Sequence, residues 1–270
     1  MSRVSRSVEP AAADSMVPHL PPLPTGHVRW WTVGATTAMA GVLCLGAYAG
    51  TGPLMAATVL AAGVLAFGWP ALLALPSPRG TTTVVAVGGA MCVAAVGFTH
   101  DEPLLQWLSL AVAGSVVAEF VHQLARRDGR PRVVESSTGA LVAVALIASL
   151  SALVALPRTA SGAAGVTVTV LPVTVALALA LLPMPARITS GIGTLAAVLV
   201  GALLGGLVDG PTSVAGAVAG GLGASVALML HRLLAVLPAA GWAPGWLALA
   251  VSPLAASGIV GYVILRLLAG

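Results

Sequence analysis

Residues 188–235 read ITSGIGTLAAVLVGALLGGLVDGPTSVAGAVAGGLGASVALMLHRLLA, and a short Asp-Gly-Pro turn at 209–211 divides this apolar stretch in two. A helix needs about 20 mostly apolar residues to cross a bilayer, so the stretch predicts a hairpin of two membrane-spanning helices. Small residues four apart let helix backbones approach closely in lipid. The glycines with this spacing, which we expect to pack the two helices together, are Gly201, Gly205, Gly216 and Gly220.

The rest of the chain repeats this apolar pattern. Mean hydropathy is +1.03 over 270 residues, 58% of the residues are hydrophobic and only 7% are charged. A water-soluble fold of this size needs a polar exterior, and only a helix satisfies the backbone within lipid when no alternating strands are present. The composition therefore predicts an all-α, polytopic transmembrane bundle of about nine spans. The predicted spans are 31–48, 54–75, 82–99, 104–124, 136–156, 166–182, 188–208, 214–235 and 246–268.

Two regions follow from the composition. The first 27 residues contain five prolines and four charged residues and show no periodicity. Such a segment cannot bury enough apolar surface to fold, so we expect residues 1–28 to be a disordered cytoplasmic tail. Residues 29–270 then form the transmembrane helical domain. Cys44 and Cys92 each lie inside an apolar stretch, where a thiol behaves as a small hydrophobic group.

Arginine alone sets the predicted orientation, because the chain contains no lysine. Cytoplasmic loops of membrane proteins carry an excess of basic residues. If the N-terminus is cytoplasmic, only Arg158 and Arg266 lie outside. We therefore expect a cytoplasmic N-terminus, and an odd number of spans places the C-terminus outside. The arginines expected inside are Arg3, Arg6, Arg29, Arg79, Arg126, Arg127, Arg130, Arg132, Arg187 and Arg232.

Glu119 and His122 form a polar pair in the predicted fourth span. Residues three apart share one side of a helix, and ionisable groups within a membrane indicate function until shown otherwise. The pair could relay protons or bind a metal. Alternatively, both side chains could face the cytoplasmic headgroups or pair with Arg126. A carboxylate-bridged metal bundle needs a second Glu-x-x-His motif and further glutamates, which the sequence lacks. We expect no metal site.

The loop at 126–132, Arg-Arg-Asp-Gly-Arg-Pro-Arg, is the most distinctive polar segment. Asp-Gly favours a tight turn and Arg-Pro stops a helix from running through, so we expect a compact loop. Guanidinium groups bind phosphates and carboxylates through paired hydrogen bonds. The loop could bind a lipid phosphate or an acidic partner, or it could serve only to fix topology. The candidate binding residues are Arg126, Arg127, Arg130 and Arg132.

No catalytic constellation is found. The sequence contains no nucleophile elbow, no phosphate-cradling loop followed by lysine and no cluster of aspartates for a magnesium-dependent lipid enzyme. We therefore expect no catalytic residue, no cofactor and no enzymatic activity. The high isoelectric point reflects arginines beside membrane spans, so nucleic acid is not an expected partner.

The stretch from His122 to Arg132, followed by Glu135 and Ser136, resembles a loop of uncharacterised multi-span integral membrane proteins of actinobacteria. The segments Gly68-Trp-Pro70 and Pro76-Ser-Pro-Arg-Gly80 are similar to segments of the same proteins. The resemblance covers about a quarter of the chain. It implies that the protein is located in a Gram-positive plasma membrane. Some actinobacterial membrane proteins of this general kind act in septum formation, so a role in cell division is a further alternative by analogy.

The sequence thus predicts a non-enzymatic plasma-membrane protein that binds or organises envelope partners through its tail and its arginine loop. Two alternatives stay open: a small-solute or lipid transporter, and a membrane-embedded enzyme that uses Glu119 and His122. The expected partners are the bilayer with its anionic phospholipid headgroups and another membrane or cytoplasmic protein. All three functional hypotheses are compatible with a homo-oligomer.

Overall fold

The structure is a computed structural model that describes residues 28–127, 129 and 131–268. Its described residues form helices, turns and loops, without strands. Eight helical segments are long and apolar enough to cross a membrane, and α6 is a shorter apolar helix of 16 residues. The α-helices are α1 (Trp30–Ala49), α2 (Thr51–Leu72), α3 (Pro78–Gly97), α4 (Leu108–Ala125), α5 (Val133–Ser151), α6 (Ala164–Leu179), α7 (Ala186–Leu207), α8 (Ser213–Ala235) and α9 (Gly245–Leu268).

The predicted all-helical fold is confirmed, and each predicted span overlaps one of these helices. Several predicted boundaries differ from the helix ends by three to five residues, and two of these differences have a clear cause. The fourth helix starts at Leu108 instead of residue 104, because residues 101–107 fold as bends and turns around Pro103. The fifth α-helix ends at Ser151, and two 3₁₀ turns, η1 (Ala152–Val154) and η2 (Leu156–Arg158), continue it. Pro157 has no N–H group to donate to an α-helical ladder. The predicted tail lies outside the described residues, apart from Val28.

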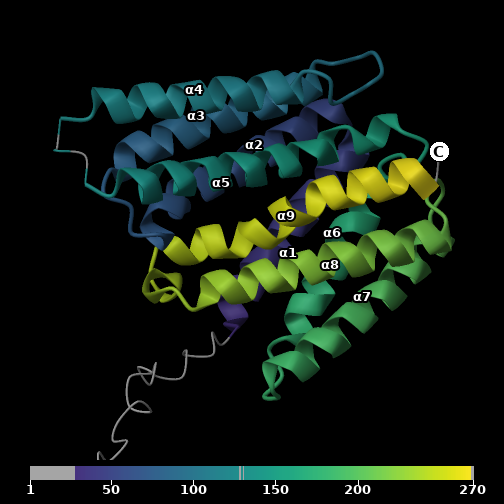
Figure 1. Cartoon of the computed structure of the whole chain (residues 1–270). Helices are drawn as coiled ribbons and strands as arrows, with labels where there is room; N and C mark the ends of the chain where they lie inside the picture. The colour runs from purple at the N-terminus through teal and green to yellow at the C-terminus, as the bar shows by residue number, and fades with distance from the viewer. Residues whose placement is uncertain (1–27, 128, 130, 269–270) are drawn as a thin grey trace, which may run out of the picture.

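Helix α9 lies at the centre of the bundle, in contact with α1, α2, α5, α6 and α8 (Figure 1). Two groups of three consecutive helices flank it: α3, α4 and α5 contact one another, and so do α6, α7 and α8. Helices α4 and α7 lie at the periphery of their groups, and both expose rows of large apolar side chains. Exposed apolar rows of this kind are suited to contact lipid.

The two ends of the bundle differ in charge. We call the end at which α1 begins and at which α4 is followed by α5 the arginine end; the α4–α5 connection lies at the left of Figure 1. Only Arg158 and Arg266 of the described arginines lie at the opposite end, next to the α3–α4 turns. The described arginines at the arginine end are Arg29, Arg79, Arg126, Arg127, Arg132, Arg187 and Arg232.

The α7–α8 hairpin packs backbone against backbone. A Cβ atom added to Gly201 would collide with the carbonyl oxygen of Gly216, and one added to Gly216 would collide with that of Gly201. A Cβ on Gly220 would lie 2.8 Å from the carbonyl oxygen of Ala197, and one on Gly205 would meet that of Thr212. The four glycines singled out in the sequence therefore lie where the two helices touch.

Candidate functional site

A buried polar network joins α4 to α5 at the arginine end. Gln123 is its centre: its amide nitrogen donates to Oε1 of Glu119 at 2.5 Å and to Oγ of Ser136 at 3.1 Å. Glu119 is only 1% exposed, and its second oxygen, Oε2, has no hydrogen-bond partner among the described residues. Helical spacing of four residues puts Glu119 and Gln123 on one face of α4. This face packs against the first turn of α5.

Arg126 extends the network into the loop. Its Nη1 donates to Oε1 of Gln123 at 2.9 Å, and its Nη2 donates to the carbonyl oxygen of Pro131 at 3.4 Å. The side chain folds back onto the bundle and is buried. A charge at such a position is stabilised only when hydrogen bonds replace its lost hydration. Arg126 therefore holds the loop to the helices, and it is a poor candidate for binding an external partner.

Glu119 and His122 do not meet. The ring of His122 packs against the backbone of Gly80 on α3, with Nε2 lying 3.5 Å from Oγ of Ser77. Glu119 has its partner on α4 and lies toward α5. Although the two residues share one side of α4, that helix packs against both α3 and α5, so each side chain has a different neighbour. The arrangement offers no direct path for a proton between them.

The other loop arginines have different roles. Arg127 is exposed. Arg132 immediately precedes α5; its Nε pairs with the carboxylate of Glu135, and its Nη1 donates to the carbonyl oxygen of Ala74 at 2.9 Å. Ala74 follows α2, so this bond ties the α2–α3 connection to α5. Arg130 lies outside the described residues.

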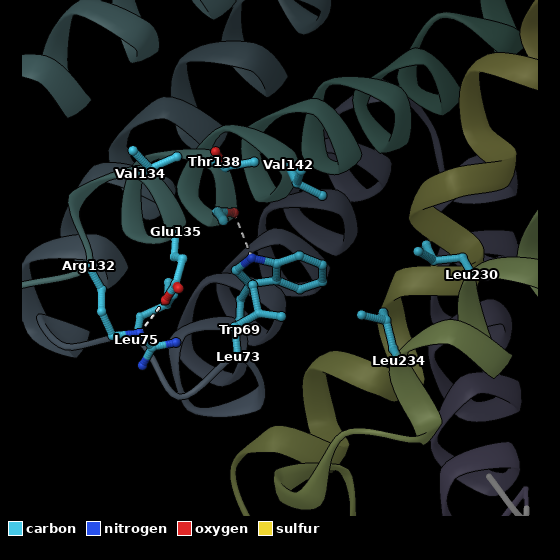
Figure 2. A pocket seen from close by; sticks show the side chains of 11 residues that line it. Trp69, Leu73, Leu75, Arg132, Val134, Glu135, Thr138, Val142, Leu230 and Leu234 are labelled. Atoms are coloured by element: carbon cyan, nitrogen blue, oxygen red, sulfur yellow. Dashed lines mark hydrogen bonds and ion pairs between the residues drawn. The ribbon is translucent and has the colours of Figure 1, made fainter. Parts of the chain in front are cut away.

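A lateral groove of about 470 Å³ opens beside Arg132, between α2, α5 and α8. Figure 2 shows Leu230 and Leu234 of α8 facing Trp69 of α2 and Val142 of α5 across it. The indole of Trp69 is almost fully buried, and its N–H donates to the carbonyl oxygen of Gly139 at 2.8 Å. The groove is therefore bordered by α5 on one side and α8 on the other, and its walls are mostly apolar.

The polar end of the groove consists of Arg132 and Glu135, which Figure 2 shows beside Leu75. The sequence did not reveal this groove. Its walls come from three helices far apart in the chain, and the apolar side chains in them look like any other lipid-facing residues. Trp69 carried the only signal, as the one tryptophan located in the interior of a predicted span.

Two further polar sites were missed. At the opposite end, Arg266 forms a two-point ion pair with Glu102, with N–O distances of 2.9 and 3.1 Å. Arg158 donates to the carbonyl oxygens of Val96 (2.8 Å) and Thr99 at the end of α3, where a cation also complements the helix dipole. In the sequence, the available indication was that Arg158 and Arg266 are the two arginines expected on the opposite side from all the others. These contacts join segments that are far apart in the chain.

Comparison with known proteins yields no assignment: no family model, no curated protein and no solved structure matches this chain. Any function must therefore be argued from the residues themselves.

Proposed function

We propose that this chain is a non-enzymatic, multi-pass plasma-membrane protein that binds an acidic envelope partner through its arginine loop. The observation that carries the proposal is that the arginines of the loop differ in their contacts. Arg126 and Arg132 bond to other parts of the bundle and fix the loop, whereas Arg127 is exposed and makes no such bond to the described residues. A fixed loop loses less conformational entropy on binding than a floppy one. An exposed guanidinium on such a loop is suited to a carboxylate or phosphate.

We further propose nine crossings with the arginine end in the cytoplasm. The gathering of the described arginines at one end supports this orientation through the positive-inside bias. The sixth crossing is α6 together with the turns beside it, since the helix itself has 16 residues. A short apolar helix can be accommodated by local thinning of the bilayer. The N-terminal tail, in this orientation, lies on the same side as the loop.

Binding is favoured over solute transport by the character of the buried polar groups. Many buried hydroxyls donate to carbonyl oxygens of their own helix, as Thr58 does to Leu54, Ser115 to Ala111 and Ser151 to Ile147. Such bonds occupy the hydroxyl protons locally. The protons of these three hydroxyls are therefore not available to a solute. The groove beside Arg132 is apolar as well, which does not suit a polar solute.

The proposal predicts that Arg127→Gln combined with Arg130→Gln reduces recovery of the partner. Purification of the tagged full-length protein from native membranes, after cross-linking, measures the recovered proteins. The double variant should insert normally, because the remaining arginines maintain the orientation. It should lose the proteins that the wild type retains. Each charge-assisted hydrogen bond is worth about 1.5–3 kcal/mol, so loss of two weakens binding at least tenfold.

The matched control is Arg79→Gln with Arg187→Gln, which removes two exposed arginines from the same end without touching the loop. This control should retain the partner. Equal recovery of the same proteins by the wild type and by the loop variant, at equal expression, would show that the loop only fixes topology.

A further inference from the structure

The groove between α2, α5 and α8 has a steep polarity gradient. Its walls are formed by apolar side chains such as Trp69, Val142 and Leu230, and its charged groups, Arg132 and Glu135, lie together at one end. A volume of about 470 Å³ falls within the range of ligand pockets, roughly 300–1,000 Å³. A ligand that matches this gradient has one charged end and a long apolar body.

The length of the groove matches one leaflet of a bilayer. Ten residues separate Arg132 from Val142, and a helix rises 1.5 Å per residue, so these positions are about 15 Å apart along α5. The hydrocarbon core of a bilayer is about 30 Å thick, and half of this is the depth that one acyl chain occupies. Val134 and Val142, which line the groove, are both exposed, so the groove opens at the surface of the bundle.

The charged end favours an anion. Arg132 is held by Glu135 and by the carbonyl oxygen of Ala74, so its guanidinium is fixed at the mouth while its side chain stays half exposed. Its Nη2 has no partner among the described residues. The segment 126–135 carries four arginines against two carboxylates, Asp128 and Glu135. The N-terminus of α5, with the positive end of its dipole, lies beside the same point.

We propose that this groove binds one acyl chain of an anionic glycerophospholipid, whose phosphate contacts Arg132. The apolar walls enclose the chain and the guanidinium selects the headgroup. The site goes beyond the proposed partner binding: it needs no other protein, and it uses Arg132, whereas the partner experiment changes Arg127 and Arg130. Failure of either experiment therefore leaves the other interpretable.

Trp69 provides a direct probe, because bromine atoms on an acyl chain quench a nearby indole. A full-length protein that keeps Trp69 and has phenylalanine at its other five tryptophans is reconstituted into phosphatidylcholine vesicles. Increasing fractions of brominated phosphatidylglycerol or brominated phosphatidylcholine are then added. The brominated anionic lipid should reach half-quenching at about a fivefold lower mole fraction, the ratio that corresponds to about 1 kcal/mol for one basic group near anionic lipid.

Arg132→Gln should abolish the preference for phosphatidylglycerol, while Arg187→Gln, on the first turn of α7 and away from the groove, should retain it. Val142→Phe fills the groove and should remove the preference even if Arg132→Gln cannot be purified. Equal quenching by the two lipids in the wild type overturns the proposal. So does a preference that survives in Val142→Phe, since the lipid would then be bound elsewhere.

Discussion

Gly201→Leu is expected to destabilise the bundle more than any other single change on α7. The backbone of Gly201 touches that of Gly216, so a leucine side chain has no room unless α7 and α8 separate. Overpacking of a tight contact costs about 1–3 kcal/mol, and more where backbone must move. The expected result is a clearly lower thermal unfolding midpoint in detergent. Unfolding is measured by the reaction of the Cys92 thiol, which is buried in the folded protein, with a fluorescent maleimide.

Gly191→Leu is the matched control for this change. Gly191 lies on the same helix, is exposed, and has no atoms near the position of an added Cβ. It should unfold at the wild-type temperature. If Gly201→Leu and Gly191→Leu unfold alike, the close packing of α7 on α8 is wrong.

Gln123→Leu is expected to have the second large effect, at the other side of the bundle. Gln123 connects Glu119, Ser136 and Arg126. A leucine of similar size removes these bonds and leaves a buried carboxylate without its amide donor. Hydrogen bonds to charged groups contribute about 1.5–3 kcal/mol. The unfolding midpoint should fall, and the loop that Arg126 holds should become sensitive to protease.

The chain offers a matched control, because Gln106 is its only other glutamine. Gln106 is exposed in the turns before α4, and its side chain makes no hydrogen bond with the described residues. Gln106→Leu should leave both the midpoint and the protease pattern unchanged. A Gln123→Leu protein with wild-type stability and an intact loop would show that the network does not fix the α4–α5 connection.

The sequence was sufficient for the helices because one constraint dominates them. Runs of apolar residues as long as a bilayer is thick, divided by turns such as Asp-Gly-Pro at 209–211, leave little choice of secondary structure. The residues at which helices begin and end were harder to predict. Nothing in the hydropathy of residues 104–107 separates turn from helix, and the change from α to 3₁₀ after Ser151 is hidden in an uninterrupted apolar run.

The candidate site was less predictable, because helix periodicity fixes which residues share a face but not what that face meets. Glu119 and His122 illustrate the limit: their spacing suggested joint chemistry, but α4 packs against two helices and each residue has its own neighbour. The loop arginines were found by composition alone. Their separation into anchoring residues, Arg126 and Arg132, and an exposed one, Arg127, depends on carbonyl groups that no sequence pattern reveals.

The proposed partner loop and tail require that the arginine end faces the cytoplasm, which makes orientation the central claim. Single cysteines at Asp128 and at Asp101, each in a protein whose Cys44 and Cys92 are replaced by alanine, test it in intact cells. Asp101 lies in the exposed turns at the opposite end. A membrane-impermeant maleimide should label Asp101→Cys from outside, and should label Asp128→Cys only after the cells are opened. Labelling of Asp128→Cys in intact cells, with Asp101→Cys protected, would contradict the account.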